Sequence, residues 1–92
     1  MTREDFKRWL EYVSVTFPSF RAWMATIDDE VRKLTLDRWF VAMTSVSLVA
    51  ASSVVDDMLR GTVPMPRRWD EVVPTVLPRA RERDLVAKEL LG

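Results

Sequence analysis

The sequence predicts a small all-α protein, a single-domain bundle of four to five helices over residues 1–92. Apolar residues recur at helical spacing along most of the chain, and no segment alternates apolar and polar residues as a half-buried strand would. With 92 residues, of which 48% are hydrophobic and 30% charged, the chain is long enough for one modest core and too short for two.

The residue inventory argues against several classes of function. The 14 basic and 14 acidic residues cancel, so no overall field attracts nucleic acid or an anionic membrane. Cysteine and histidine are both absent, which excludes disulfides, Cys/His zinc sites, thiol catalysis and histidine general-base chemistry. We therefore expect no catalytic residues, no metal and no cofactor.

The same inventory predicts a cytoplasmic protein with no membrane association. The chain begins with the charged residues Arg3, Glu4 and Asp5, unlike a signal peptide. Its longest apolar run, near residues 46–55, is about half a membrane span.

A first helix is expected over residues 2–16. Thr2 and Asp5 have the spacing of a capping box. The helix should end at Phe17, because Pro18 disfavours helical geometry in the residue before it. Its apolar positions follow one helical face, formed by Phe6, Trp9, Leu10, Val13 and Phe17.

Residues 18–34 are expected to be helical next, since Pro18 suits the first position of a helix. The acidic run 28–30 is typical of a new N-terminal turn, because carboxylates there complement the helix dipole. One helix and two short helices are thus equally compatible with this range. Its apolar stripe comprises Phe20, Trp23, Met24, Ile27, Val31 and Leu34.

The least polar part of the chain predicts two further helices, over residues 35–46 and 47–60. Ser47 is placed as an N-cap, and Gly61 stands where a helix ends in the left-handed conformation. Each helix has an apolar face at helical spacing: Leu36, Trp39, Phe40 and Met43 in the first, and Leu48, Ala51, Ser52, Val55 and Leu59 in the second.

Residues 62–78 contain four of the five prolines, too many for a long helix. We expect an extended stretch over 62–66, a short helical turn over 67–73 that brings Trp69 onto the core, and a terminal helix over 79–91. The apolar residues of that helix gather at its end, where docking on the body and presentation to a partner are equally compatible with the pattern. They are Val86, Ala87, Leu90 and Leu91.

Candidate binding residues lie in the last third of the chain. Arginines next to an aromatic ring suit contacts with phosphates and bases, or with a protein partner. Acidic neighbours such as Asp70 and Glu82 keep the local charge small, so a solvated surface is the simpler interpretation. The candidates are Arg67, Arg68, Trp69, Arg79, Arg81 and Arg83.

Other aromatic residues are expected in the core rather than in a site. They are Phe6, Trp9, Phe17, Phe20, Trp23, Trp39 and Phe40. The carboxylate pairs 28–29 and 56–57 are predicted to be helix surface, because adjacent residues on a helix point about 100° apart. Hydroxyl residues have no histidine to activate them.

Taken together, residues 3–73 resemble the N-terminal domain of the phage helicase loader/inhibitor family. The resemblance is carried by the opening helix REDFKRWLEYVSVTFPSF with its Phe17-Pro18 step, the pair Trp39-Phe40 opening a helix, the alanine-rich helix over 48–59 and the proline segment over 63–72. It implies a protein that binds a hexameric replicative DNA helicase, holds it inactive and helps to deliver it to the origin.

Two functions of different classes follow. The first is a non-enzymatic replication accessory protein that loads or inhibits a helicase. The alternative is a small phage or bacterial regulator that binds another host protein through its Arg/Trp-rich surface. Direct DNA binding is a third and weaker possibility. We expect a monomer or a weak homodimer, formed by the exposed apolar end of the last helix.

Overall fold

Residues 1–91, the part of the chain that the computed structural model describes, contain five α-helices and one short 3-10 helix. The predicted all-α class is confirmed. In chain order the elements are α1 (Arg3–Thr16), α2 (Pro18–Thr26), α3 (Asp29–Met43), α4 (Leu48–Arg60), η1 (Trp69–Glu71) and α5 (Val72–Leu91).

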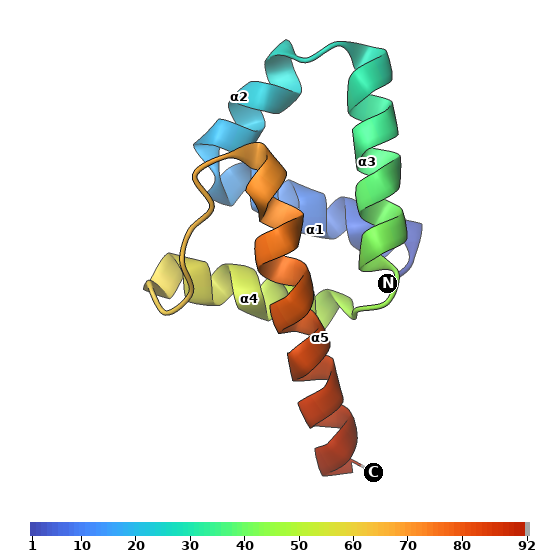
Figure 1. Cartoon of the computed structure of the whole chain (residues 1–92), viewed down its shortest axis with the longest axis vertical. Coiled ribbons are helices and arrows are strands. Elements are labelled where there is room, and N and C mark those ends of the chain that lie inside the picture. The colour runs from blue at the N-terminus through green and yellow to red at the C-terminus, as the bar shows by residue number, and fades with distance from the viewer. Residues whose placement is uncertain (92) are drawn as a thin grey trace.

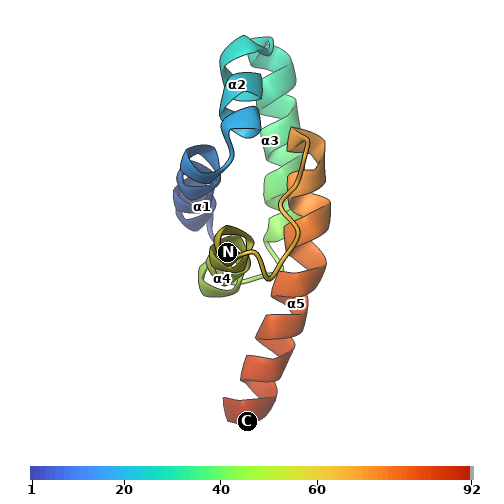
Figure 2. The same cartoon turned by 90° about the vertical axis from the view of Figure 1, so that its left-hand side faces the viewer.

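The helices form an elongated bundle of 44 × 27 × 18 Å (Figure 1). α2 and α3 lie at one end of the long axis, α1 and α4 lie across the middle, and α5 runs along most of the molecule. In both Figure 1 and Figure 2 the last turns of α5 extend past α4 and away from every other helix. α5 packs mainly on α4, and more lightly on α3.

The predicted capping residues cap the helix ends at the predicted positions. Thr2 and Asp5 form the reciprocal bonds of a capping box at the start of α1. Ser47 Oγ accepts a hydrogen bond from the Ala50 amide, 3.0 Å away, at the start of α4. Gly61 ends α4 with φ +83°, in the left-handed region.

The range 18–34 is divided between two helices. α2 ends at Thr26, and the Asp28 side chain accepts from the Glu30 amide to cap a new helix, as the acidic run allowed. The predicted boundary between residues 34 and 35 is wrong, because α3 continues through it to Met43. The next break lies close to the predicted one between residues 46 and 47, since α3 ends at Met43 and α4 begins at Leu48.

The predicted terminal helix over 79–91 is also longer than expected. α5 begins at Val72 and includes Pro74 and Pro78. Pro74 lies in the first turn, where the amide group has no intrahelical acceptor to lose. Pro78 removes one hydrogen bond from a helix of 20 residues, which the packing of Val76 and Ala80 against the core offsets.

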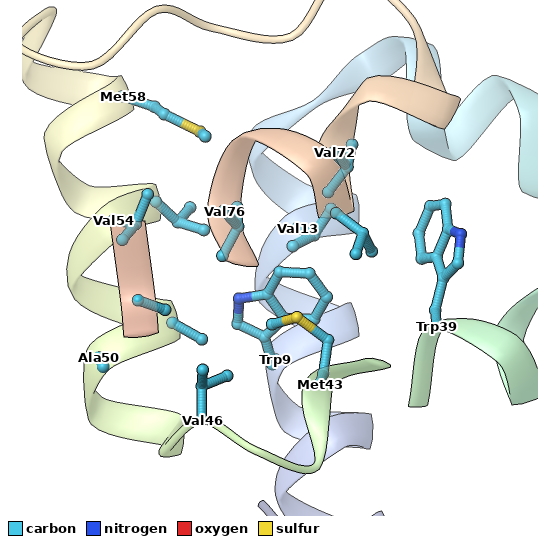
Figure 3. Close-up of a cluster of buried hydrophobic side chains, with 14 of the residues drawn as sticks. Trp9, Val13, Trp39, Met43, Val46, Ala50, Val54, Met58, Val72 and Val76 are labelled. Carbon is cyan, nitrogen blue, oxygen red and sulfur yellow. The ribbon is translucent and has the colours of Figure 1, made fainter. Parts of the chain in front are cut away.

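The core lies where α1, α4 and the first half of α5 meet (Figure 3). Trp9 is fully buried there, beside Met43 from α3 and valines from α4 and α5. Small residues on α4, such as Ala51, let neighbouring helices approach closely. The labelled cluster in Figure 3 comprises Trp9, Val13, Trp39, Met43, Val46, Ala50, Val54, Met58, Val72 and Val76.

Most of the predicted core aromatics are buried. Phe6, Trp9, Phe17, Phe20 and Trp39 belong to the core, whereas Trp23 and Phe40 are half-buried and pack against it. Some residues of the predicted apolar stripes are not buried: the side chains of Val31, Leu34 and Leu59 are about half exposed. α4 buries Ala51 and Val55 as predicted, and it also buries Ala50, Val54 and Met58, so its buried face is shifted toward these residues and away from Leu59.

No single helix in residues 1–91 is both long enough and apolar enough to cross a membrane. α3 and α4 reach the required length and composition only when taken together, and they are bent by 108° at the break between them.

Candidate protein-interaction surface

The middle of α5 is fixed to α4 by two adjacent charged residues. Arg83 donates to Asp57 Oδ2 over 2.5 Å and to Ser53 Oγ over 2.8 Å. Asp84 accepts from the backbone amide of Ser47 over 2.8 Å and from Ser47 Oγ over 2.7 Å. The cap that starts α4 is therefore also a contact between α4 and α5. Up to Asp84, α5 is docked on the body.

Beyond Asp84 the same helix is exposed. The side chains of Leu85 and Val86 are 61% and 49% exposed, and those of Leu90 and Leu91 are 82% and 90% exposed. Burying a leucine side chain is worth about 1.5–3 kcal/mol, so an isolated chain leaves a substantial favourable contact unmade here. Of the two arrangements that the sequence left open for this apolar end, docking on the body is not the one adopted, because Val86, Leu90 and Leu91 are all exposed.

An open groove of about 500 Å³ runs along one side of this segment. We call it the α5 groove. Buried Val63, from the segment after α4, forms part of its wall, and Arg79 and Glu82 are its polar rim. Its remaining lining residues are Arg83, Val86, Ala87 and Leu90. An apolar floor with a few charged side chains suits an amphipathic helix or an apolar peptide.

The six predicted binding residues do not form one patch. Arg79 and Arg83 line the α5 groove, whereas Arg67 and Arg68 are exposed on the loop before η1. Arg68 pairs with Asp70 over 3.3 Å. Arg81 is exposed on α5 and is not part of the groove lining. The arginines thus belong to two separate regions.

Trp69 has an internal role. Its ring stacks on Trp23 with centroids 4.2 Å apart and an interplanar angle of 13°, and its centroid is 6.2 Å from that of Trp39. It connects η1 to α2 and α3, which agrees with the prediction that Trp69 folds back onto the core. The half-buried ring leaves little aromatic surface for a partner.

The paired carboxylates take part in the fold. Asp28 caps α3, Asp29 pairs with Arg32, and Asp57 binds Arg83. Asp56 accepts a hydrogen bond from the Tyr12 hydroxyl. This bond, together with burial, raises the pKa of Tyr12 above its ordinary value of 10.0. Within residues 1–91, no three acidic side chains converge as metal ligands would.

A second hollow, of about 540 Å³, lies between α1 and α3. Phe6, Leu10 and Leu36 contribute its apolar surface, and Arg3 crosses its edge to pair with Asp37 over 3.2 Å. Its lining side chains Phe6, Leu10 and Leu36 are buried or half-buried. The α5 groove, by contrast, continues into leucines that are almost fully exposed, and it is the stronger candidate for a partner surface.

The sequence indicates the apolar end of the last helix, but it does not indicate which contacts hold the preceding turns of that same helix on the body. The roles of Arg83 and Asp84 depend on where α5 crosses α4, which the pattern of either helix alone does not contain. Val63 was likewise not singled out, since a lone valine in a proline-rich segment carries no local signal. No family model, no curated protein and no solved structure matches the chain, so the interpretation of this surface rests on its own residues.

Proposed function

We propose that this chain is a non-enzymatic protein-binding module whose recognition element is the exposed end of α5 with the α5 groove beside it. By its resemblance to the phage helicase loader/inhibitor family, the proposed partner is a hexameric replicative DNA helicase, which the chain loads or inhibits. The observation that supports the proposal is the exposure of Leu90 and Leu91 on a helix that is firmly docked about two turns earlier, at Asp84.

The physical argument is one of preorganisation. Arg83 and Asp84 hold the helix in place, so its exposed turns are already ordered before a partner arrives. Less conformational entropy is then lost on binding than with a disordered peptide. Apolar side chains at the centre and charged side chains at the rim are also the usual arrangement of a protein interface.

The test is co-elution of this chain with the hexameric replicative helicase of the genome that encodes it, on size-exclusion chromatography with and without nucleotide. We expect a complex with the wild-type chain and none with Leu90→Glu, which places a charge in the apolar contact. The matched control is Val15→Glu, because Val15 is 72% exposed on α1, away from α5. It should bind as the wild type does.

Two results would contradict this proposal in different ways. No complex with the wild-type chain would exclude the helicase as partner. A complex that Leu90→Glu leaves intact would place the interface elsewhere on the molecule.

A second candidate is a regulator that binds another host protein through the loop before η1. The exposure of Arg67 and Arg68 supports it. In that case Arg67→Glu with Arg68→Glu should abolish partner capture, while Leu90→Glu should have no effect. The two candidate surfaces are therefore distinguished by the same pair of variants, whatever the partner is.

A further inference from the structure

The segment that joins α4 to α5 is extended and largely exposed. We call residues 61–68 the strap; it leads from the end of α4 to η1 along the outside of the bundle (Figure 1). Val63 is buried, whereas Met65 is 47% exposed and the two arginines at the end of the strap are also exposed. Pro64 and Pro66 have no amide hydrogen to donate. The backbone of the strap is therefore less firmly held than that of the helices on either side.

The two arginines, Arg67 and Arg68, differ from the rest of the basic residues in their backbone. Every other lysine and arginine of residues 1–91 lies inside an α-helix. Arg68 has φ −127° and ψ 153°, which is an extended conformation. Exposed loops are the preferred sites of proteolytic nicking, and trypsin-like proteases select the bond that follows a basic residue. The fold thus presents the substrate of such an enzyme in one place.

The arginines nearest to the strap in sequence and in space are better protected. Arg60 ends α4, and the amides of Gly61, Thr62 and Val63, which follow it, all donate to carbonyl groups of that helix. Arg83 lies inside α5, and its guanidinium binds α4. Cleavage after either residue requires helical hydrogen bonds to open first, and such openings are rare in a folded domain.

Within the strap, the bond between Arg67 and Arg68 is the more accessible one. The bond after Arg68 leads directly into Trp69, whose half-buried ring stacks on Trp23. A protease that cuts after Arg68 must displace this ring from its active site. A cut after Arg67 keeps the stacked ring one residue farther away.

We propose that the strap is a processing site, at which an arginine-specific endoprotease of the serine or cysteine class cleaves the folded chain between Arg67 and Arg68. The reaction is a hydrolysis. The hydroxyl group of water adds to the carbonyl carbon of Arg67, the C–N bond breaks, and the amide nitrogen of Arg68 takes up the proton. The products are residues 1–67, with a new carboxylate, and residues 68–92, with a new amino group.

The cut makes the attachment of α5 dissociable. In the intact chain the strap keeps α5 beside the body at an effective concentration on the order of millimolar. After the cut, α5 is held by the burial of Val72, Val73, Val76 and Ala80 and by the hydrogen bonds of its charged residues to α4. Its attachment then depends on protein concentration. An isolated helix of this length is marginal in water, so release of α5 also unfolds it.

This inference goes beyond the proposed function, because it separates the recognition element from the body and so switches the module off. It needs no partner and is tested on the purified whole chain. Its failure and the failure of the proposed function are thus separate outcomes.

The first test is limited digestion of the folded chain with an arginine-specific endoproteinase, followed over time by mass spectrometry. The first products should be residues 1–67 and 68–92. Arg67→Gln with Arg68→Gln should slow the first cleavage roughly tenfold or more, because the remaining arginines become accessible only when a helix opens.

The matched control is Arg8→Gln with Arg38→Gln, which removes two exposed arginines from α1 and α3. It should leave the rate and the site of the first cleavage unchanged. A first cut within any helix would overturn the proposal, and so would a strap variant that is cleaved as fast as the wild type. A first product that ends at Arg68 would overturn the assignment of the bond.

The second test measures the far-ultraviolet circular dichroism of the cut protein, after the protease is inhibited, over about a hundredfold dilution. The helical signal per residue should fall on dilution of the cut protein. It should stay constant for the Arg67→Gln/Arg68→Gln chain, treated with the protease in the same way. A cut protein whose signal does not depend on concentration would overturn the proposed switch.

Discussion

Arg83 of α5 and Asp57 of α4 approach to 2.5 Å, and with Ser53 they join the two helices at the point where α5 leaves the body. The two side chains keep 33% and 26% of their surface exposed. Water therefore still screens the pair, and its net contribution should be modest, at about 1 kcal/mol. Its position matters more than its strength, because it defines which part of α5 is docked.

A double-mutant cycle measures this contact. Arg83→Met and Asp57→Asn should each lower the free energy of unfolding, and the two losses together should exceed the loss in the double variant by about 1 kcal/mol. Urea denaturation of the four proteins gives the coupling. Strictly additive losses would mean that Arg83 acts through its aliphatic stem or through Ser53 rather than through Asp57.

The bond from Tyr12 to Asp56 makes stability depend on alkaline pH. The Asp56 hydrogen bond and burial raise the pKa of Tyr12 above 10.0. The folded state therefore holds the phenol proton more tightly than the unfolded state. This difference contributes fully to the free energy of unfolding below about pH 10. The contribution is lost as the pH rises through the raised pKa of Tyr12.

Tyr12→Phe should lower the free energy of unfolding by about 1–2 kcal/mol at neutral pH, because a hydrogen bond to a carboxylate is removed. Denaturation at several pH values should show the difference between wild type and variant shrinking above pH 10. A constant difference up to the highest pH at which both proteins fold would contradict the cause assigned to the shift.

Ser47 caps α4 and also donates to Asp84, so its hydroxyl serves a local and a tertiary contact. Ser47→Ala should lower the free energy of unfolding by about 1–2 kcal/mol, the upper part of the range for an N-cap. Ser45→Ala is the matched control, since Ser45 is exposed and caps no helix. It should change stability by less than about 0.5 kcal/mol. Equal effects of the two substitutions would show that the cap is dispensable.

A glycine is needed at position 61 because the backbone there has a positive φ, and not because a larger side chain would clash with its surroundings. Its φ is +83°, and a β-carbon built there meets no atom within 4 Å. Gly61→Ala should therefore cost about 1 kcal/mol of backbone strain. Gly61→Asn should cost less, because asparagine tolerates the left-handed region. Thermal unfolding ranks the three proteins. An asparagine variant less stable than the alanine variant would contradict this account.

The elements that sequence predicted well are those with a local cause. Thr2, Ser47 and Gly61 act within one turn of their own position, so their residue types and neighbours are sufficient signals. The elements predicted wrongly depend on distant contacts. α5 begins seven residues earlier than expected because Val72 and Val76 are buried against the body, a gain that outweighs the prolines.

The candidate site was predicted only in part, for the same reason. The apolar end of α5 can be recognised in the sequence. Whether another helix covers it depends on how far α4 extends alongside α5 in the folded chain. Arg83 was predicted as a binding residue from its type alone, and it is largely committed to Asp57. Arginines that are clustered in the sequence form a binding surface only where the fold leaves their guanidinium groups without an internal partner.

The stack of Trp69 on Trp23 also has an optical consequence. Indole rings whose centroids lie 4.2 Å apart couple their ultraviolet transitions, and Trp39 lies close enough to take part. The near-ultraviolet circular dichroism of this chain should therefore report the packing of η1 on α2 and α3. The overhanging turns of α5 contain no tryptophan, so substitutions at Leu90 or Lys88 should leave that spectrum unchanged. This spectrum therefore distinguishes a substitution that weakens partner binding from one that unfolds the chain.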